Sequence, residues 1–64
     1  MEVKKTGTYR LLKPWSSMGG RSIAHYPIGT ILFIDQIDTD AHKIIGPQLS
    51  DWEDWELPVE EAKP

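Results

Sequence analysis

The sequence predicts a single all-β domain, and three features indicate this class. Apolar residues, many of them β-branched or aromatic, gather in runs too short for core helices. Gly, Pro, Asp and Ser separate these runs at close intervals. The chain has 64 residues and no cysteine, so neither disulfides nor thiolate zinc sites hold it together. We therefore expect a small closed or nearly closed barrel, which removes sheet edges without such links.

The first half of the chain predicts a strand, a loop and a turn. Residues Thr8 to Lys13 (TYRLLK) favour a first strand that Pro14 ends. The following PWSSMGGRS is dense in Pro, Ser and Gly and predicts a loop, after which IAHY is a short extended piece. In YPIG, Pro27 suits the second position of a type I turn and Gly29 the fourth.

Residues Thr30 to Ile37 (TILFIDQI) give the strongest strand signal. Both faces are apolar early, whereas Asp35 and Gln36 make the later half polar, which predicts a strongly bent strand that is exposed at its end. DTDA (38–41) predicts a turn, because Asp hydrogen-bonds to its own backbone, and HKIIG (42–46) returns as a hairpin arm. The two faces of the strand carry Ile31, Phe33 and Ile37 on one side and Leu32 and Ile34 on the other.

The segment SDWEDWELPVEE predicts one helical turn followed by a closing strand. Ser50 and Glu53 have the spacing of a capping box, and Pro58 prevents the helix from running far. A single 3₁₀ turn fits this length and would place Trp52 and Trp55 on one side. Residues 55–59 then alternate apolar and polar side chains, which predicts an edge strand with Trp55 in the core.

The expected organisation is one domain of about five short strands and one single-turn 3₁₀ helix. We expect residues 1–6 to be a flexible N-terminus, residues 7–59 to form the barrel and residues 60–64 to be a flexible acidic tail. A domain this small buries only about 60% of the surface of its unfolded chain, so its core has little room.

This order of parts resembles the small Src-homology-3-type (SH3-like) barrel. YPIGTILFI is similar to the diverging-turn segment of that fold, and GTYRLLKP…YPIGTILFID is similar to small proteins encoded by tailed phages and prophages. The resemblance covers residues 7–59 and implies a binding or assembly module rather than an enzyme. The ALYDY-like motif and the double Trp of peptide-binding members are absent, so their polyproline groove does not transfer to this chain.

Charge is distributed unevenly along the chain, whose net charge is −3. Residues 1–29 hold five basic residues against one acid, whereas residues 30–64 hold two basic residues against nine acids. Overall acidity disfavours nucleic acid, because neutralising phosphates needs clustered Lys and Arg. Small barrels do bind single strands through aromatic and basic side chains, and Tyr9, Arg10 and Tyr26 are the candidates for this alternative. A second alternative is an acidic inhibitor that imitates DNA.

The sequence indicates neither a metal site nor a cofactor nor a catalytic centre. DQIDTDAH fails as a calcium loop, because the sixth and twelfth residues counted from Asp38 are Lys43 and Leu49 rather than Gly and Glu. SMGGRS could form an anion nest, but it lacks the GK[ST] ending of a P-loop, and we favour a flexible loop. Serines and histidines are present, but a domain this small has little volume to enclose a triad and its oxyanion hole.

A protein partner is the function class that the aromatic residues favour. Trp, Tyr and Arg are the side chains that most often anchor interfaces, and a core this small does not hide three Trp completely. The acidic run near the C-terminus could steer a basic partner. A homo-oligomer, such as a ring-forming virion piece, is a further possibility. The expected partner surface comprises Trp15, Arg21, Trp52, Glu53 and Asp54.

Location follows from what the sequence lacks. No apolar run approaches the roughly 20 residues of a membrane span, and MEVKK does not open a secretory leader. We expect a cytoplasmic protein, of a bacterial or a virus-infected host cell, with the virion as an alternative, and no membrane partner.

Overall fold

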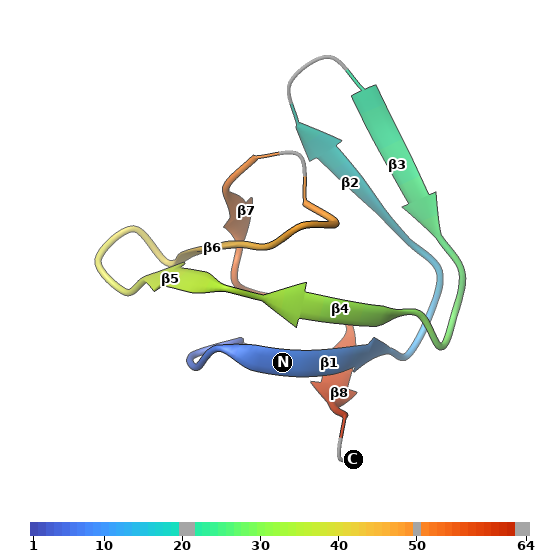
Figure 1. Ribbon diagram of the computed structural model, residues 1–64, viewed down its shortest axis with the longest axis horizontal. Coiled ribbons are helices and arrows are strands. Elements are labelled where there is room, and N and C mark those ends of the chain that lie inside the picture. Colours follow the sequence, from blue (N-terminus) through green and yellow to red (C-terminus); the bar gives the residue numbers. More distant parts are fainter. Residues whose placement is uncertain (20–21, 50, 63–64) are drawn as a thin grey trace.

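The described part of the chain forms eight short β-strands in three small sheets (Figure 1). The computed structural model describes residues 1–19, 22–49 and 51–62, and within these ranges there is no helix. The all-β class is therefore confirmed, whereas the described strands form separate sheets rather than a closed barrel. The strands are β1 (Gly7–Leu11), β2 (Trp15–Gly19), β3 (Ser22–Tyr26), β4 (Ile31–Ile34), β5 (Gln36–Asp38), β6 (Lys43–Ile45), β7 (Glu53–Asp54) and β8 (Val59–Glu61).

The first sheet has the order β4-β1-β8, with β1 antiparallel to both neighbours. Tyr9 lies opposite Leu32, and Leu11 lies opposite Val59, so these four side chains point to the same side of the sheet. All four are buried. Alternation along the strands, apolar inward and polar outward, therefore makes this sheet one wall of the core.

The second sheet, β5-β6-β7, begins where β4 ends. Asp35 interrupts the strand between β4 and β5, and its N–H donates to the carbonyl oxygen of Ile45 at 2.9 Å. The expected bend in residues 30–37 is thus located at Asp35, where the chain leaves the first sheet and enters the second. The tight turn over residues 39–42 is also as predicted: Asp38 Oδ1 accepts hydrogen bonds from the N–H groups of Asp40 and Ala41, both at 3.0 Å.

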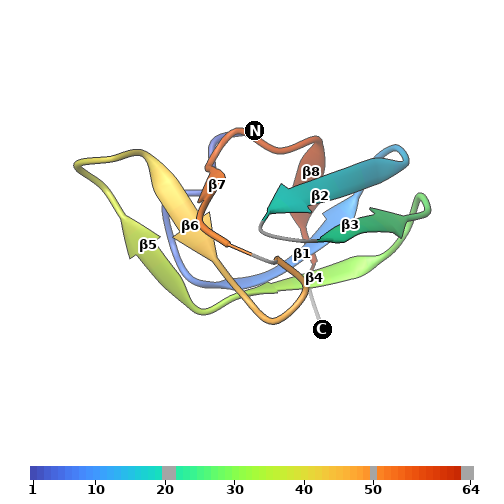
Figure 2. The same cartoon turned by 90° about the horizontal axis from the view of Figure 1, so that it is seen from above.

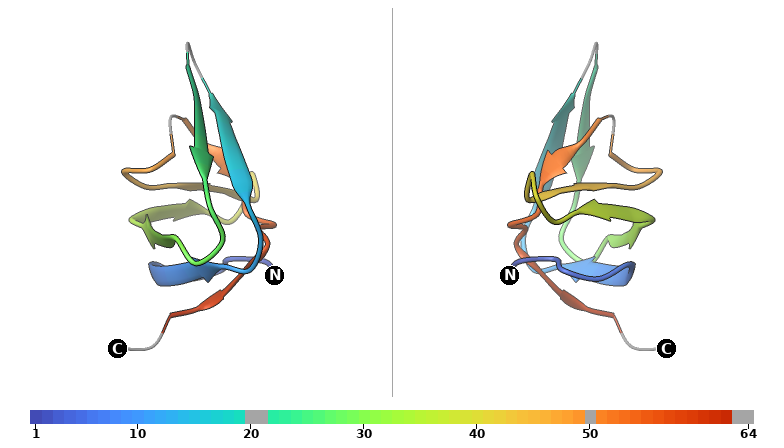
Figure 3. Two further views of the ribbon diagram at one scale, coloured as in Figure 1. Left: turned by 90° about the vertical axis from the view of Figure 1, so that its right-hand side faces the viewer. Right: turned by 90° about the vertical axis from the view of Figure 1, so that its left-hand side faces the viewer.

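The PWSSMGGRS segment is not a loop over its whole length, as the sequence analysis expected. Its residues 15–19 form β2, which pairs with β3 from Trp15–Tyr26 to Gly19–Ser22. This ribbon projects from one end of the molecule, opposite the C-terminal end (Figure 3). Pairing satisfies the backbone of a segment whose composition is typical of loops.

The turn between β3 and β4 differs in type from the prediction. The N–H of Thr30 donates to the carbonyl oxygen of Pro27 at 3.2 Å, so Pro27 occupies the first position and Gly29 the third. Gly29 has a φ of +88°, which a type II turn requires at its third position. The expected type I turn, with Pro27 second, is therefore incorrect.

The predicted 3₁₀ turn is not confirmed, because residues 53–54 form strand β7 instead. Lys43 pairs with Asp54, and Ile44 pairs with Glu53. The Ser50 half of the expected capping box lies outside the described residues. The burial predicted after Trp55 is confirmed for Leu57 and Val59, but the closing strand lies later than predicted: β8 begins at Val59 and ends at Glu61, past the expected end of the barrel at residue 59.

The N-terminal segment is part of the fold rather than a separate flexible end. Val3 is completely buried, and its N–H donates to the carbonyl oxygen of Trp55 at 2.9 Å. The N–H of Leu57 donates to the carbonyl oxygen of Met1 at 3.0 Å. The N-terminal segment thereby lies along residues 55–57, next to the second sheet.

The core draws on both multistranded sheets and on the segments between them. Gly46 lies where they meet: a Cβ atom there would overlap the carbonyl oxygen of Phe33 and approach its carbonyl carbon to 3.0 Å. Gln48 then covers the outer edge of β4. Its side-chain amide accepts from the N–H of Phe33 at 3.0 Å and donates to the carbonyl oxygen of Ile31 at 2.8 Å. The buried core comprises Val3, Tyr9, Leu11, Leu32, Ile34, Ile44, Leu49, Leu57 and Val59.

Candidate functional site

Trp52 is the exposed tryptophan of the three. It lies directly before β7, and 42% of its surface is accessible. Its backbone N–H donates to the carboxylate of Asp51 at 2.8 Å. The next two residues pair with β6, so a large exposed indole is carried by backbone that the sheet holds in place.

Trp55, three residues later, has a different environment. Its ring stacks on His42, with centroids 4.4 Å apart and planes 7° from parallel, and Lys4 Nζ lies 5.7 Å from its centroid. Its N–H donates to the carbonyl oxygen of His42 at 3.0 Å. Trp55 also packs against the core, although it is only partly buried. The expectation that Trp55 belongs to the core is therefore confirmed in part, and Trp52 is the one left for a partner.

Glu53 and Asp54 point to opposite sides of the second sheet, because side chains alternate along a strand. Glu53 Oε1 accepts a hydrogen bond from the buried Ser17 hydroxyl at 2.9 Å, which ties β7 to β2. Asp54 is exposed, and its carboxylate accepts from the N–H of Glu56 at 2.9 Å. Of the two predicted site carboxylates, Asp54 is available to a partner, whereas Glu53 is engaged inside the fold.

The outer face of the second sheet brings Trp52 together with residues that the sequence analysis did not select. Asp38 lies opposite Lys43, and Lys43 lies opposite Asp54, so these three side chains form a row across the sheet. Trp52 lies directly before β7, two residues from Asp54, and adds an exposed indole next to this row in the chain. We call Asp38, Lys43, Trp52 and Asp54 the acidic face. The hairpin register of DQID against HKII could have revealed this row.

Trp15 is not part of this face. It pairs with Tyr26 across the β2–β3 ribbon, with ring centroids 6.4 Å apart, and it packs against the core. The hydroxyl of Tyr26 donates to the carbonyl oxygen of Gln48 at 2.7 Å. The expected grouping of Trp15 with Trp52 therefore does not follow from the contacts. Arg21 lies outside the described residues.

Two of the three residues of the nucleic-acid alternative are engaged in the first sheet. Tyr9 is 1% exposed, and its hydroxyl donates to the carbonyl oxygen of Lys5 at 2.7 Å, so its ring has no free face for a base. Arg10 Nη1 lies 3.0 Å from the carboxylate of Glu60. Tyr26, the third, stacks with Trp15.

The ion pairs of the described residues all use glutamates. The N-terminal ammonium, Lys4, Lys5 and Arg10 pair with Glu56, Glu2, Glu61 and Glu60, at 3.1, 3.5, 3.0 and 3.0 Å respectively. Three of these four pairs join N-terminal cations to C-terminal acids. Two of the pairs, Lys5–Glu61 and Arg10–Glu60, lie on the first sheet, whereas none of the ion pairs of the described residues involves an aspartate of the acidic face.

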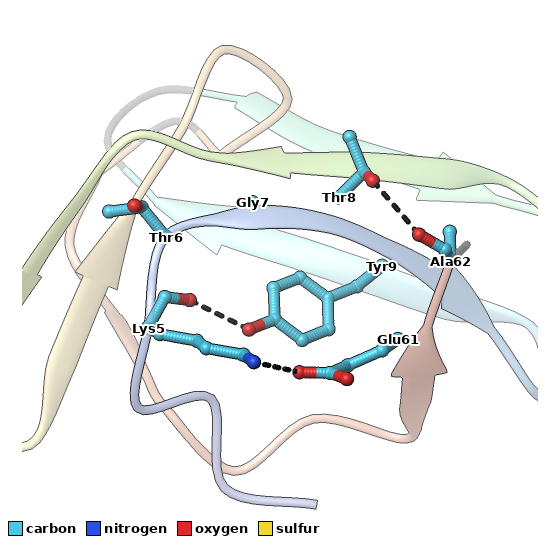
Figure 4. Close-up of a pocket in the computed structure, with 7 residues that line it drawn as sticks. All are labelled: Lys5, Thr6, Gly7, Thr8, Tyr9, Glu61 and Ala62. Carbon is cyan, nitrogen blue, oxygen red and sulfur yellow. Dashed lines mark hydrogen bonds and ion pairs between the residues drawn. The ribbon is translucent and has the colours of Figure 1, made fainter. Parts of the chain in front are cut away.

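A shallow pocket of about 190 Å³ lies between the start of β1 and the end of β8 (Figure 4). The ion pair between Lys5 and Glu61 spans it, and the Thr8 hydroxyl donates to the carbonyl oxygen of Ala62 at 3.3 Å. The hydrogen bond to Glu61 and its negative charge raise the pKa of Lys5. Burial, followed by the charge of Glu61, raises the pKa of Tyr9. Internal partners already satisfy these groups, so the pocket is not the candidate site.

A serine and a histidine contact each other on the β2–β3 ribbon. Ser16 Oγ lies 2.7 Å from His25 Nδ1, and both side chains are exposed. The two residues are cross-strand neighbours, and no third group orients the imidazole among the described contacts. In residues 1–19, 22–49 and 51–62, no three His, Asp or Glu side chains are placed to hold a metal ion, and no helix is long and apolar enough to cross a membrane.

Comparison with protein-family models, with curated proteins and with solved structures found no match to this chain.

Proposed function

We propose that this protein is a small, non-enzymatic protein-binding or assembly module built on an SH3-like plan. One observation carries the proposal: Trp52 exposes a large indole directly before residues 53–54, which pair with β6, and its N–H donates to the carboxylate of Asp51. Exposed aromatic side chains on fixed backbone lose little conformational freedom on binding and are typical anchors of interfaces. The acidic face surrounds this anchor with charge.

The order of the strands supports the SH3-like plan. The first strand, a turn, a bent central strand, a tight hairpin and a last strand follow one another as in the resemblance drawn from the sequence, whereas the β2–β3 ribbon stands where the resemblance has a long polar loop. The bent β4–β5 segment takes part in both multistranded sheets. Strand β7 stands where the resemblance predicted a helical turn. A phage or prophage origin remains a proposal that rests on the similarity of GTYRLLKP…YPIGTILFID alone.

Neither alternative has an observation of comparable weight. A single-strand binder needs accessible aromatic and basic side chains, and Tyr9 and Arg10 are engaged elsewhere. A DNA imitation needs carboxylates in a long track, whereas the row across the second sheet has Lys43 at its centre.

The proposal is tested by affinity capture from a cell extract, comparing the wild-type protein with Trp52→Ala. We expect the variant to lose the proteins that the wild type captures, with a thermal melt that changes little, because Trp52 is not part of the core. Phe33→Ala is the matched control: Phe33 is 46% exposed on β4, away from the acidic face, and its variant should capture the same proteins. Equal capture by Trp52→Ala and the wild type would contradict the proposal.

A further inference from the structure

We infer that the acidic face binds a cationic, extended segment of its partner, with one basic side chain packed on Trp52. This inference rests on the proposed function and adds the chemistry of the partner. Its basis is a sheet face on which Asp38 and Asp54 lie on either side of Lys43, with the exposed indole of Trp52 directly before β7.

The geometry of the face suits an extended segment. Neighbouring strands of a sheet are about 4.8 Å apart. Asp38 and Asp54 are on the two strands that flank Lys43, so their positions on the sheet are separated by roughly twice that distance. In an extended chain, side chains that point the same way recur every two residues, at about 6.6 to 6.8 Å. The two spacings differ by about 3 Å, which the long side chains of Lys or Arg at alternate positions can cover to reach both aspartates.

Charge complementarity selects a cationic occupant. Asp38 and Asp54 accept hydrogen bonds from backbone N–H groups, which orients their carboxylates but does not neutralise them. The N-terminal ammonium, Lys4, Lys5 and Arg10 of this chain are paired with glutamates and not with these aspartates. A basic side chain over the indole face would gain a cation–π interaction in addition to the carboxylates.

The same ion pairs argue against a second copy of this chain as the occupant. The N-terminal ammonium, Lys4, Lys5 and Arg10 would each have to leave a carboxylate before they could reach the acidic face of another molecule. Lys13 is exposed and takes part in none of the ion pairs of the described residues, but a single lysine does not offer the several cations of a basic segment.

Lys43 makes the inference testable in both directions. It is half-buried in the centre of the row, where its positive charge opposes that of an incoming cation. Removing it should strengthen the binding of a basic segment, whereas removing Asp54 should weaken it. A purely structural role of these side chains would not produce opposite signs.

The experiment titrates the whole protein, labelled with ¹⁵N, with a capped peptide of three Arg-Ser repeats and follows the three indole N–H signals. We expect the Trp52 signal to move and the Trp15 and Trp55 signals to stay. Asp54→Asn should weaken binding about two- to five-fold and Lys43→Gln should strengthen it by a similar factor, as exposed charges do. Binding should also weaken as salt is added.

Asp54→Asn keeps an oxygen that accepts from the N–H of Glu56, so the fold is preserved in this variant. Asp40→Asn is the matched control, because it removes the same charge from the hairpin turn and should change the affinity less than Asp54→Asn does. The inference is overturned if the peptide does not bind, if Asp54→Asn and Asp40→Asn act alike, or if a Glu-Ser peptide or oligothymidine binds as well.

The outcome separates the two proposals. If the Arg-Ser peptide does not bind but Trp52→Ala still abolishes capture from the extract, the partner is not cationic and the proposed function stands. If the peptide binds at the acidic face but capture does not depend on Trp52, the proposed function fails.

Discussion

The two multistranded sheets use charge in different ways. Around β4-β1-β8, ion pairs join Lys5 to Glu61 and Arg10 to Glu60, so that residues far apart in the sequence are fastened to each other. On β5-β6-β7, Asp38 and Asp54 lie on either side of Lys43 and accept backbone hydrogen bonds without losing their charge. Seen from above, the hairpin of the second sheet lies at the opposite end of the molecule from the turn that leads into β4 (Figure 2).

The two sheets of this 64-residue chain also differ in how much they contribute to the core. Among the described residues, the first sheet contributes five of the nine core side chains. The ion pair between Lys5 and Glu61 joins the two ends of the chain beside this sheet. The second sheet contributes only Ile44 from its strands and carries Trp52 at its border. A small domain can leave charges unneutralised on one sheet because the other sheet supplies most of the burial.

The largest effect should come from the point where the two sheets meet. Gly46→Ala would place a Cβ atom against the backbone carbonyl of Phe33, which cannot move aside as a flexible side chain could. We expect the free energy of unfolding to fall by about 3 kcal/mol, measured by chemical denaturation. Thr39→Ala, in the exposed hairpin turn, is the control and should change it by less than about 0.5 kcal/mol. A similarly small loss for Gly46→Ala would show that the sheets are not packed this closely.

Local pattern was sufficient to predict part of this fold. The pattern in residues 30–37 predicted strand, and DTDA predicted a turn, because burial of side chains and Asp hydrogen bonding both act over a few residues. The alternation in residues 55–59 predicted the burial of Leu57 and Val59 but placed the last strand too early, since β8 begins at Val59. The β2–β3 ribbon was missed, since Ser and Gly in WSSMG are typical of loops. Contacts distant in sequence accompany the strand there: Tyr26 with Gln48, and Ser17 with Glu53.

The same reasoning explains the other differences. The two-residue capping signal at 50 and 53 favoured a helical turn, but β7 instead pairs with β6, and the Trp55 N–H finds its acceptor on His42. Val3 is buried, and its N–H donates to the carbonyl oxygen of Trp55 near the other end of the chain. No local pattern indicates a contact between residues so far apart in sequence. For the candidate site, the sequence already grouped Trp52 with Asp54, whereas only the paired register placed Asp38 and Lys43 beside Asp54 and Trp15 opposite Tyr26 on the ribbon.

Alkaline pH should destabilise the protein through the first sheet. The pKa values of Tyr9 and Lys5 are raised from their ordinary 10.0 and 10.5. Above these values the unfolded chain releases protons that the folded protein retains, so stability is fully present below pH 10 and falls as the pH rises through the raised values. Tyr9→Phe should reduce this decline, measured as the difference in unfolding free energy between about pH 8 and pH 11. An unchanged decline in Tyr9→Phe would show that other groups cause it.

The smallest effect compares a single charge on each sheet. Glu60→Gln removes the partner of Arg10, and because both side chains are about half exposed we expect a loss of only about 0.2–1 kcal/mol, which should shrink as salt is added. Asp54→Asn keeps the hydrogen bond from the Glu56 N–H and has no cation to release among the described ion pairs, so stability should not fall. Chemical denaturation of both variants at low and high salt measures the contrast. A loss for Asp54→Asn as large as that for Glu60→Gln would mean that the second sheet, too, uses its carboxylates for stability, and the acidic face would then have no surplus charge to offer a partner.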